Sequence, residues 1–139
     1  MRMVSLYLLF ALASSDVTRQ PERLPLPLES AAHDLEGAYW VEGRFGDKTY
    51  LGTALVGRHG DLYEIQYATT AGGYSGFGLL SGGLLSIGWT QGTSRGVVAY
   101  RVLPGSVLDG RYVIHNGKGT DGKVYRETLT LLRRMPKEG

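Results

Sequence analysis

Glu127 is the residue of this chain whose type and surroundings point most directly to chemistry. It lies in the stretch YRETLTL at positions 125–131, in register with Tyr125, Leu129 and Leu131. In a β-strand this alternation places Glu127 on the apolar face. A buried carboxylate is costly unless it is paired or hydrogen-bonded. Glu127 is therefore interpreted in three ways: as a polar contact or raised-pKa acid in a ligand cavity, as a structural group satisfied by tyrosine hydroxyls and an arginine, or as a residue that a bulge turns outward.

Aromatic side chains with polar tips make up much of the predicted inner face. The nine tyrosines outnumber the phenylalanines and tryptophans together, and such rings suit barrel or sandwich interiors. Small eight-stranded barrels are either filled by side chains or hold one small ligand, and rings of this size favour filling. If a ligand does enter, the side chains predicted to contact it are Tyr39, Trp89, Tyr100, Tyr112 and Glu127.

Motifs that would specify a metal, a cofactor or a nucleophile do not occur in the sequence. His33, His59 and His115 have no metal-ligand spacing, and the chain has no cysteine. There is no G-x-S-x-G elbow and no P-loop. The glycines at 72–78 lead into a strand rather than a helix, and the loop at 116–122 lacks calcium-ligand spacing. We therefore predict no metal site, no cofactor and no catalytic residue, and we interpret residues 59–61 and 116–122 as hairpin connections.

Period-2 alternation and short glycine-rich connectors divide the rest of the chain into strands. The centre of the pattern is residues 72–89, where the pair Gly82-Gly83 fits a type I′ turn between two strands. Connections this short join antiparallel strands, because parallel strands need crossovers of a dozen or more residues. The predicted strands cover residues 37–44, 49–58, 62–69, 75–80, 84–90, 96–103, 107–115 and 124–133.

One apolar face and one polar face along every strand indicate an all-β fold. The prediction is a single antiparallel eight-stranded up-and-down β-barrel, with a two-sheet β-sandwich as the alternative. Closure is favoured because no predicted strand carries edge protection such as an internal proline. An internal echo, LEGAYWV at 35–41 and LDGRYVI at 108–114, places a glycine before an aromatic residue in both copies. We interpret that glycine as a bend where an aromatic ring crosses the backbone.

The N-terminal region predicts export. Residues 1–15 combine Arg2, an apolar segment too short for a stable membrane span and an A-x-A-like cleavage site at 11–13, as in a secretory signal peptide. Residues 16–33 are interpreted as a proline-rich linker and residues 34–135 as the barrel domain. Export without cysteine favours a bacterial periplasmic or secreted protein. The 15 basic and 13 acidic residues are mixed along the chain, so no nucleic-acid footprint is predicted.

The chain resembles small exported bacterial β-barrel proteins of unassigned function, some of which carry a fibronectin-binding label. The similarity rests on GAY at 37–39, GFGL at 76–79 and ETLT at 127–130, and it covers about residues 35–132. The architecture is more distantly similar to avidin-like and lipocalin-like barrels, from which no ligand residue is carried over.

Three functions follow as hypotheses. The first is non-enzymatic binding of a small apolar or aromatic ligand, or of a surface partner. The second is a structural or interaction module of the cell envelope with a filled core. The third is an envelope enzyme that uses Glu127. The sequence specifies no oligomeric state.

Overall fold

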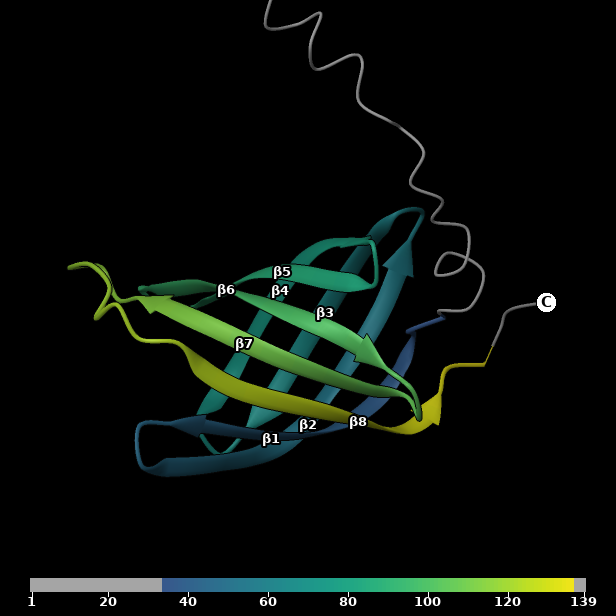
Figure 1. The fold of residues 1–139 in the computed structure, drawn as a ribbon, viewed down its shortest axis with the longest axis horizontal. Coiled ribbons are helices and arrows are strands. Elements are labelled where there is room, and N and C mark those ends of the chain that lie inside the picture. The colour runs from purple at the N-terminus through teal and green to yellow at the C-terminus, as the bar shows by residue number, and fades with distance from the viewer. Residues whose placement is uncertain (1–33, 137–139) are drawn as a thin grey trace, which may run out of the picture. The chain divides into compact units, whose positions relative to one another are not determined.

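A computed structural model describes residues 34–136, which form a closed antiparallel barrel of eight strands (Figure 1). Each strand pairs with the next along the chain, and β1 pairs with β8 to close the barrel. This arrangement confirms the predicted up-and-down barrel and replaces the sandwich alternative. The strands are β1 (Gly37–Phe45), β2 (Lys48–His59), β3 (Leu62–Thr69), β4 (Gly72–Ser81), β5 (Leu84–Gln91), β6 (Ser94–Leu103), β7 (Val107–His115) and β8 (Tyr125–Arg134).

The strand boundaries follow the alternation closely, and β3 and β7 have the predicted bounds. The largest difference is at β4, which begins at Gly72 rather than Ser75. The ladder between β3 and β4 continues through the pairs Ala68–Gly73 and Thr69–Gly72, so the turn shortens to two residues. Composition alone favours a loop for such a glycine-rich segment. The segment nevertheless extends the strand, because the backbone hydrogen bonds of a ladder need no side chains.

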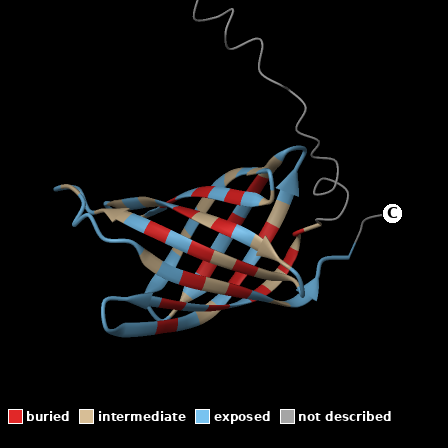
Figure 2. Ribbon diagram, viewed as in Figure 1, coloured by how far each residue is buried: buried red, intermediate tan, exposed pale blue. Residues whose placement is uncertain are grey.

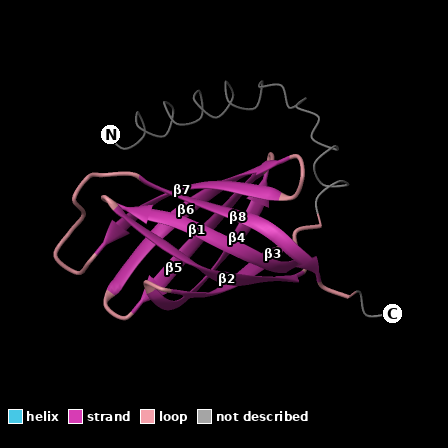
Figure 3. Ribbon diagram, turned by 90° about the horizontal axis from the view of Figure 1, so that it is seen from below, coloured by secondary structure: helices cyan, strands magenta, loops and turns pink. Residues whose placement is uncertain are grey.

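The described residues contain strands and connecting loops, and no helix long and apolar enough to cross a membrane occurs among them (Figure 3). The predicted signal peptide and proline-rich linker lie outside the described residues. The connections gather at two ends of the barrel. One end carries the β1–β2, β3–β4, β5–β6 and β7–β8 connections, and the other carries the remaining turns.

Buried and exposed residues alternate along the strands, as Figure 2 shows by colour. Glu127 is the one buried charged residue in this part of the chain, with 4% of its surface exposed. Its inward orientation confirms the assignment from alternation and excludes the outward bulge. The largest completely enclosed side chains are Tyr39, Tyr100, Ile65, Leu85, Ile87, Leu108, Leu129, Val41, Val56 and Val98.

Glycine is required where the backbone itself is crowded. Gly82 and Gly83 both have positive φ, 60° and 77°, which confirms the predicted turn between β4 and β5. Within β4, a Cβ atom on Gly78 would lie 1.7 Å from the carbonyl oxygen of Ser86. Gly76 is similarly close to the backbone of Gly88. The two inner-facing glycines therefore allow the backbones of the paired strands β4 and β5 to approach closely.

Aromatic rings cross the backbone at three further glycines. The ring of Tyr100 lies over Gly110, so that a Cβ atom there would be 2.6 Å from the ring, which confirms the aromatic crossing predicted for this copy of the echo. In the other copy, Gly37 instead lies against Leu131 and the backbone of Arg133. Two crossings were not predicted: Tyr50 over Gly43 and Trp89 over Gly96. These crossings fix the rings of three residues that surround Glu127 or the space above it.

Candidate functional site

A cavity of about 310 Å³ lies at the end of the barrel where the β1–β2, β3–β4, β5–β6 and β7–β8 connections meet. Five aromatic side chains form part of its wall, and Glu127 lies at its base. The opposite half of the interior is filled by side chains such as Tyr39, Val56 and Ile65. The barrel is therefore filled at one end and hollow at the other, which the size of the rings did not predict. The aromatic walls are Phe45, Tyr50, Tyr74, Trp89 and Tyr112, and polar residues of the rim include Gln91, Ser94, Asn116 and Asp121.

Three tyrosine hydroxyls donate hydrogen bonds to the carboxylate of Glu127. Tyr50 and Tyr74 donate to Oε1 at 2.7 Å and 3.3 Å, and Tyr100 donates to Oε2. The hydroxyl of Tyr67 lies 2.7 Å from that of Tyr100 and extends the network. These donors come from β2, β3, β4 and β6, while Glu127 is on β8. The carboxylate thus joins strands from around the barrel.

In the described part of the chain, the hydrogen-bond donors to the carboxylate of Glu127 are tyrosine hydroxyls, and no arginine is among them. No lysine or arginine is among the described residues that line the cavity, and no ion pair to Glu127 is found between residues 34 and 136. The expectation that an arginine would share this role was wrong. The two ion pairs in this part of the chain, His59–Glu64 and Arg126–Asp109, join side chains that remain partly exposed.

Burial governs the protonation of this network. It raises the pKa of Glu127 above its ordinary value of 4.5, and the hydrogen bonds from Tyr100, Tyr50 and Tyr74 offset part of that rise. Burial, with the neighbouring carboxylate, also raises the pKa of Tyr50 and Tyr74. The hydroxyls therefore stay protonated and remain donors across the physiological range.

The aromatic rings contact one another in series around the cavity. Tyr67 stacks on Tyr74 with ring centroids 4.4 Å apart. Tyr74 then meets Trp89 at 5.7 Å and a 57° angle, and Trp89 meets Tyr112 at 6.4 Å and 76°. Tyr112 lies 5.5 Å from Tyr125 and donates a hydrogen bond to the carbonyl of Arg44. The steep angles that Trp89 makes with Tyr74 and Tyr112 let these three rings form separate walls.

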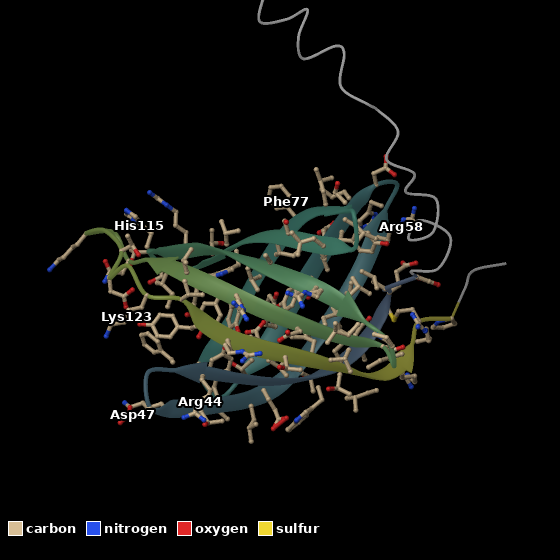
Figure 4. The ribbon with its side chains drawn as sticks, viewed as in Figure 1. Arg44, Asp47, Arg58, Phe77, His115 and Lys123 are labelled. Carbon is tan, nitrogen blue, oxygen red and sulfur yellow. The ribbon has the colours of Figure 1, made fainter. Side chains whose placement is uncertain are left out.

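The β7–β8 connection forms one side of the opening and is ordered by local hydrogen bonds. Asp121 accepts from the backbone of Lys123 and from the hydroxyl of Tyr125. Those bonds, led by Tyr125, lower the pKa of Asp121, while Asp121 raises the pKa of Tyr125 to about 12. His115 and Lys123 lie at this end of the barrel (Figure 4). No group of three or more potential metal ligands occurs among the described residues.

The structure brings four of the five predicted contact residues together. Trp89, Tyr112 and Glu127 line the cavity, and Tyr100 lies beneath it, bonded to Glu127. Tyr39 is elsewhere: it is enclosed in the filled half, and its hydroxyl donates to the carbonyl of Leu35. Tyr39 is on the predicted inner face, but it does not line the cavity.

The prediction omitted Tyr50 and Tyr74, although both contact Glu127. Tyr50 is in the same period-2 register as the buried residues Ala54 and Val56, so the alternation indicated that its side chain faces inward. The sequence indicated an inward position for Tyr74 less clearly, because Tyr74 directly precedes the predicted strand and adjoins a segment interpreted as a loop. It is in fact an inner-facing residue of β4, paired with Tyr67.

Replacing Tyr100 with phenylalanine is expected to destabilise the barrel by about 2–3 kcal/mol, because Glu127 loses a donor without regaining water. Tyr67→Phe is the matched control, since it removes one hydroxyl from the same network without touching the carboxylate. It is expected to cost about 1 kcal/mol. Urea unfolding of both variants measures the difference. Equal losses would contradict the central position of Tyr100 in the network.

Comparisons with known proteins find likeness among solved structures. No protein-family description matches the chain, and no curated protein matches it in sequence. Among solved structures, the barrel is similar to a redesigned β-barrel, mFAP0, bound to DFHBI, with a TM-score of 0.50 and 16% sequence identity. The match covers 69% of this chain and 97% of that one. At this identity the likeness supports the barrel fold alone.

Proposed function

We propose that this protein is a non-enzymatic binding module that holds a small, largely apolar or aromatic ligand at the open end of its barrel. The observation that carries the proposal is the 310 Å³ cavity with aromatic walls and a single buried carboxylate at its base. Apolar walls with few polar groups are typical of small-molecule sites. The structural neighbour mFAP0, a redesigned β-barrel, is itself bound to a small molecule, DFHBI, which agrees with this use of a β-barrel.

The network beneath the cavity favours binding over acid–base catalysis. Three tyrosine hydroxyls hold Glu127 in one position, and their raised pKa values keep them as donors. A general acid or base exchanges its proton with a substrate, whereas this carboxylate already accepts from three protein groups. Such a fixed polar group orients a ligand without reacting with it.

A surface partner is the second candidate. Apolar side chains are exposed on the outer face of the barrel, where Phe77, Val97 and Val113 are 64%, 52% and 39% exposed. Phe77 and Val97 both pair with Gly88, and Val97 pairs with Val113, so the three lie in one row across the strands. Figure 4 shows Phe77 on the outside of the barrel. None of these three residues lines the cavity at the barrel end.

We also propose that the protein is exported, as the resemblance to exported bacterial barrels implies. The support is the sequence of residues 1–15, with its Arg2, short apolar segment and small-residue cleavage site. Periplasmic or secreted location agrees with a ligand-binding module of the cell envelope.

Native mass spectrometry of the protein purified from its own cells tests these proposals together. A mass above that of the polypeptide, lost on denaturation, is the expected result, and the polypeptide mass itself reports whether a signal peptide was removed. Ser94→Phe is the control, because Ser94 lines the cavity at its rim and a ring there would obstruct ligand entry. The extra mass is expected to be absent from that variant. A bare mass for the unmodified protein would favour the structural or interaction module, and an extra mass retained in Ser94→Phe would favour the surface row.

A further inference from the structure

The titratable groups that line the cavity are all acids. Glu127 is at the base and Asp121 at the rim, and no lysine or arginine lines the space among residues 34–136. Lys118 and Lys123 belong to the same connection as Asp121, but both are exposed and neither lines the cavity. The pKa of Asp121 is lowered by its hydrogen bonds, so this rim charge persists at neutral pH. An anionic ligand would meet two carboxylates and no cation.

The walls offer aromatic faces to the same space. Tyr74, Trp89 and Tyr112 follow one another at angles of 57° and 76°, so they surround the space without forming a single stack. The face of an aromatic ring attracts a cation, and tryptophan does so most strongly. The attraction is stronger where water is excluded. Aromatic walls around a buried carboxylate are the arrangement that favours a desolvated positive charge.

The carboxylate of Glu127 has a hydrogen-bond acceptor position that no group among the described residues occupies. An ionised carboxylate has about four acceptor positions, and tyrosine hydroxyls occupy three of them on Glu127. Oε1 accepts two of these bonds and Oε2 accepts one. Burial also disfavours the ionised form, since no cation of the protein accompanies it. A neutral ligand would leave that charge uncompensated, whereas a cation would compensate it.

We propose that the ligand is an organic ammonium ion whose charged nitrogen lies among Tyr74, Trp89 and Tyr112 above Glu127 and whose apolar or aromatic body fills the rest of the cavity. This inference rests on the proposed binding function and adds the charge of the ligand to it. Glu127 supplies the counter-ion, and the rings supply the desolvated walls.

Three compounds of nearly identical shape test the charge. Phenyltrimethylammonium is cationic, tert-butylbenzene replaces its nitrogen with carbon, and 2-methyl-2-phenylpropanoate replaces one methyl group with a carboxylate. The full chain with Trp40→Phe is used, because Trp40 is on the outer face and its removal leaves Trp89 as the single tryptophan. The fluorescence of Trp89 then reports binding in the cavity that this residue lines.

The cation is expected to bind at least about tenfold more tightly than tert-butylbenzene, and the anion more weakly than either. Glu127→Gln keeps the shape of the side chain and removes its charge. It is expected to weaken binding of the cation by about tenfold or more and to change binding of tert-butylbenzene by less than about twofold. Asp121→Asn, on the exposed connection, gives a second charge variant, with an expected loss of about two- to threefold for the cation alone.

The outcomes separate the inference from the function on which it rests. Equal or tighter binding of tert-butylbenzene would overturn the cation inference and leave the cavity as a ligand site. A cation preference that persists in both Glu127→Gln and Asp121→Asn would also overturn it, because the carboxylates would then have no part in selection. If none of the three compounds binds, the result would contradict the proposed ligand-binding function and therefore also the proposed positive charge of the ligand.

Discussion

Gly78→Ala is expected to lower the free energy of unfolding by about 3 kcal/mol, among the larger losses that a single added methyl group produces. The new Cβ atom would lie 1.7 Å from the carbonyl oxygen of Ser86 and 3.0 Å from the Cα atom of Ile87. Both are backbone atoms of β5, so the clash cannot be relieved by a side-chain rotation. The strands must separate, and the ladder between β4 and β5 must weaken.

Gly57→Ala is the matched control, because it adds the same atom to another strand at a position with no neighbour within 4 Å. Its φ is not positive, so alanine is expected to be neutral or slightly stabilising there, within about 1 kcal/mol of the wild type. Urea unfolding followed by far-ultraviolet circular dichroism measures both. Similar stabilities for the two variants would show that β4 does not approach β5 as closely as the structure places it.

Glu127→Gln is expected to become progressively more stable, relative to the wild type, as the pH rises from about 4 to about 7. Burial raises the pKa of Glu127 in the folded protein above its unfolded value of 4.5. The folded state therefore holds its proton more tightly, and stability is lost as the pH rises from the unfolded pKa through the folded one. Glutamine carries no such proton. The difference in unfolding free energy between the two proteins is therefore expected to change in one direction only across this range.

Unfolding free energies of both proteins at several pH values measure this change. The tyrosines around the carboxylate, Tyr50, Tyr67, Tyr74 and Tyr100, have raised pKa values and stay neutral throughout, so they contribute equally to both proteins. Glu42→Gln on the exposed face of β1 is the control and is expected to show a much smaller change. A pH-independent difference for Glu127→Gln would mean that the hydrogen bonds cancel the cost of burial.

Local sequence determined the strands and which way their side chains face. Alternation gave the exact bounds of β3 and β7, the Gly82-Gly83 pair gave the turn, and the register of Glu127 with Leu129 gave its inward position. These features depend on the two-residue repeat of a strand and on the conformational freedom of glycine, which are properties of adjacent residues. Closure also followed, because unprotected edges must be paired.

Tertiary structure alone decided where along the barrel each side chain lies. Tyr39 and Tyr112 both face inward, yet one is enclosed in the filled half and the other lines the cavity. Glu127 finds its donor Tyr50 at a sequence separation of 77 residues. Alternation fixes the face of a strand, but height along the axis depends on the tilt and stagger of all the strands in a closed barrel. The strands and the buried carboxylate are therefore readable from the sequence, while the cavity and its tyrosine donors exist only once the barrel has closed.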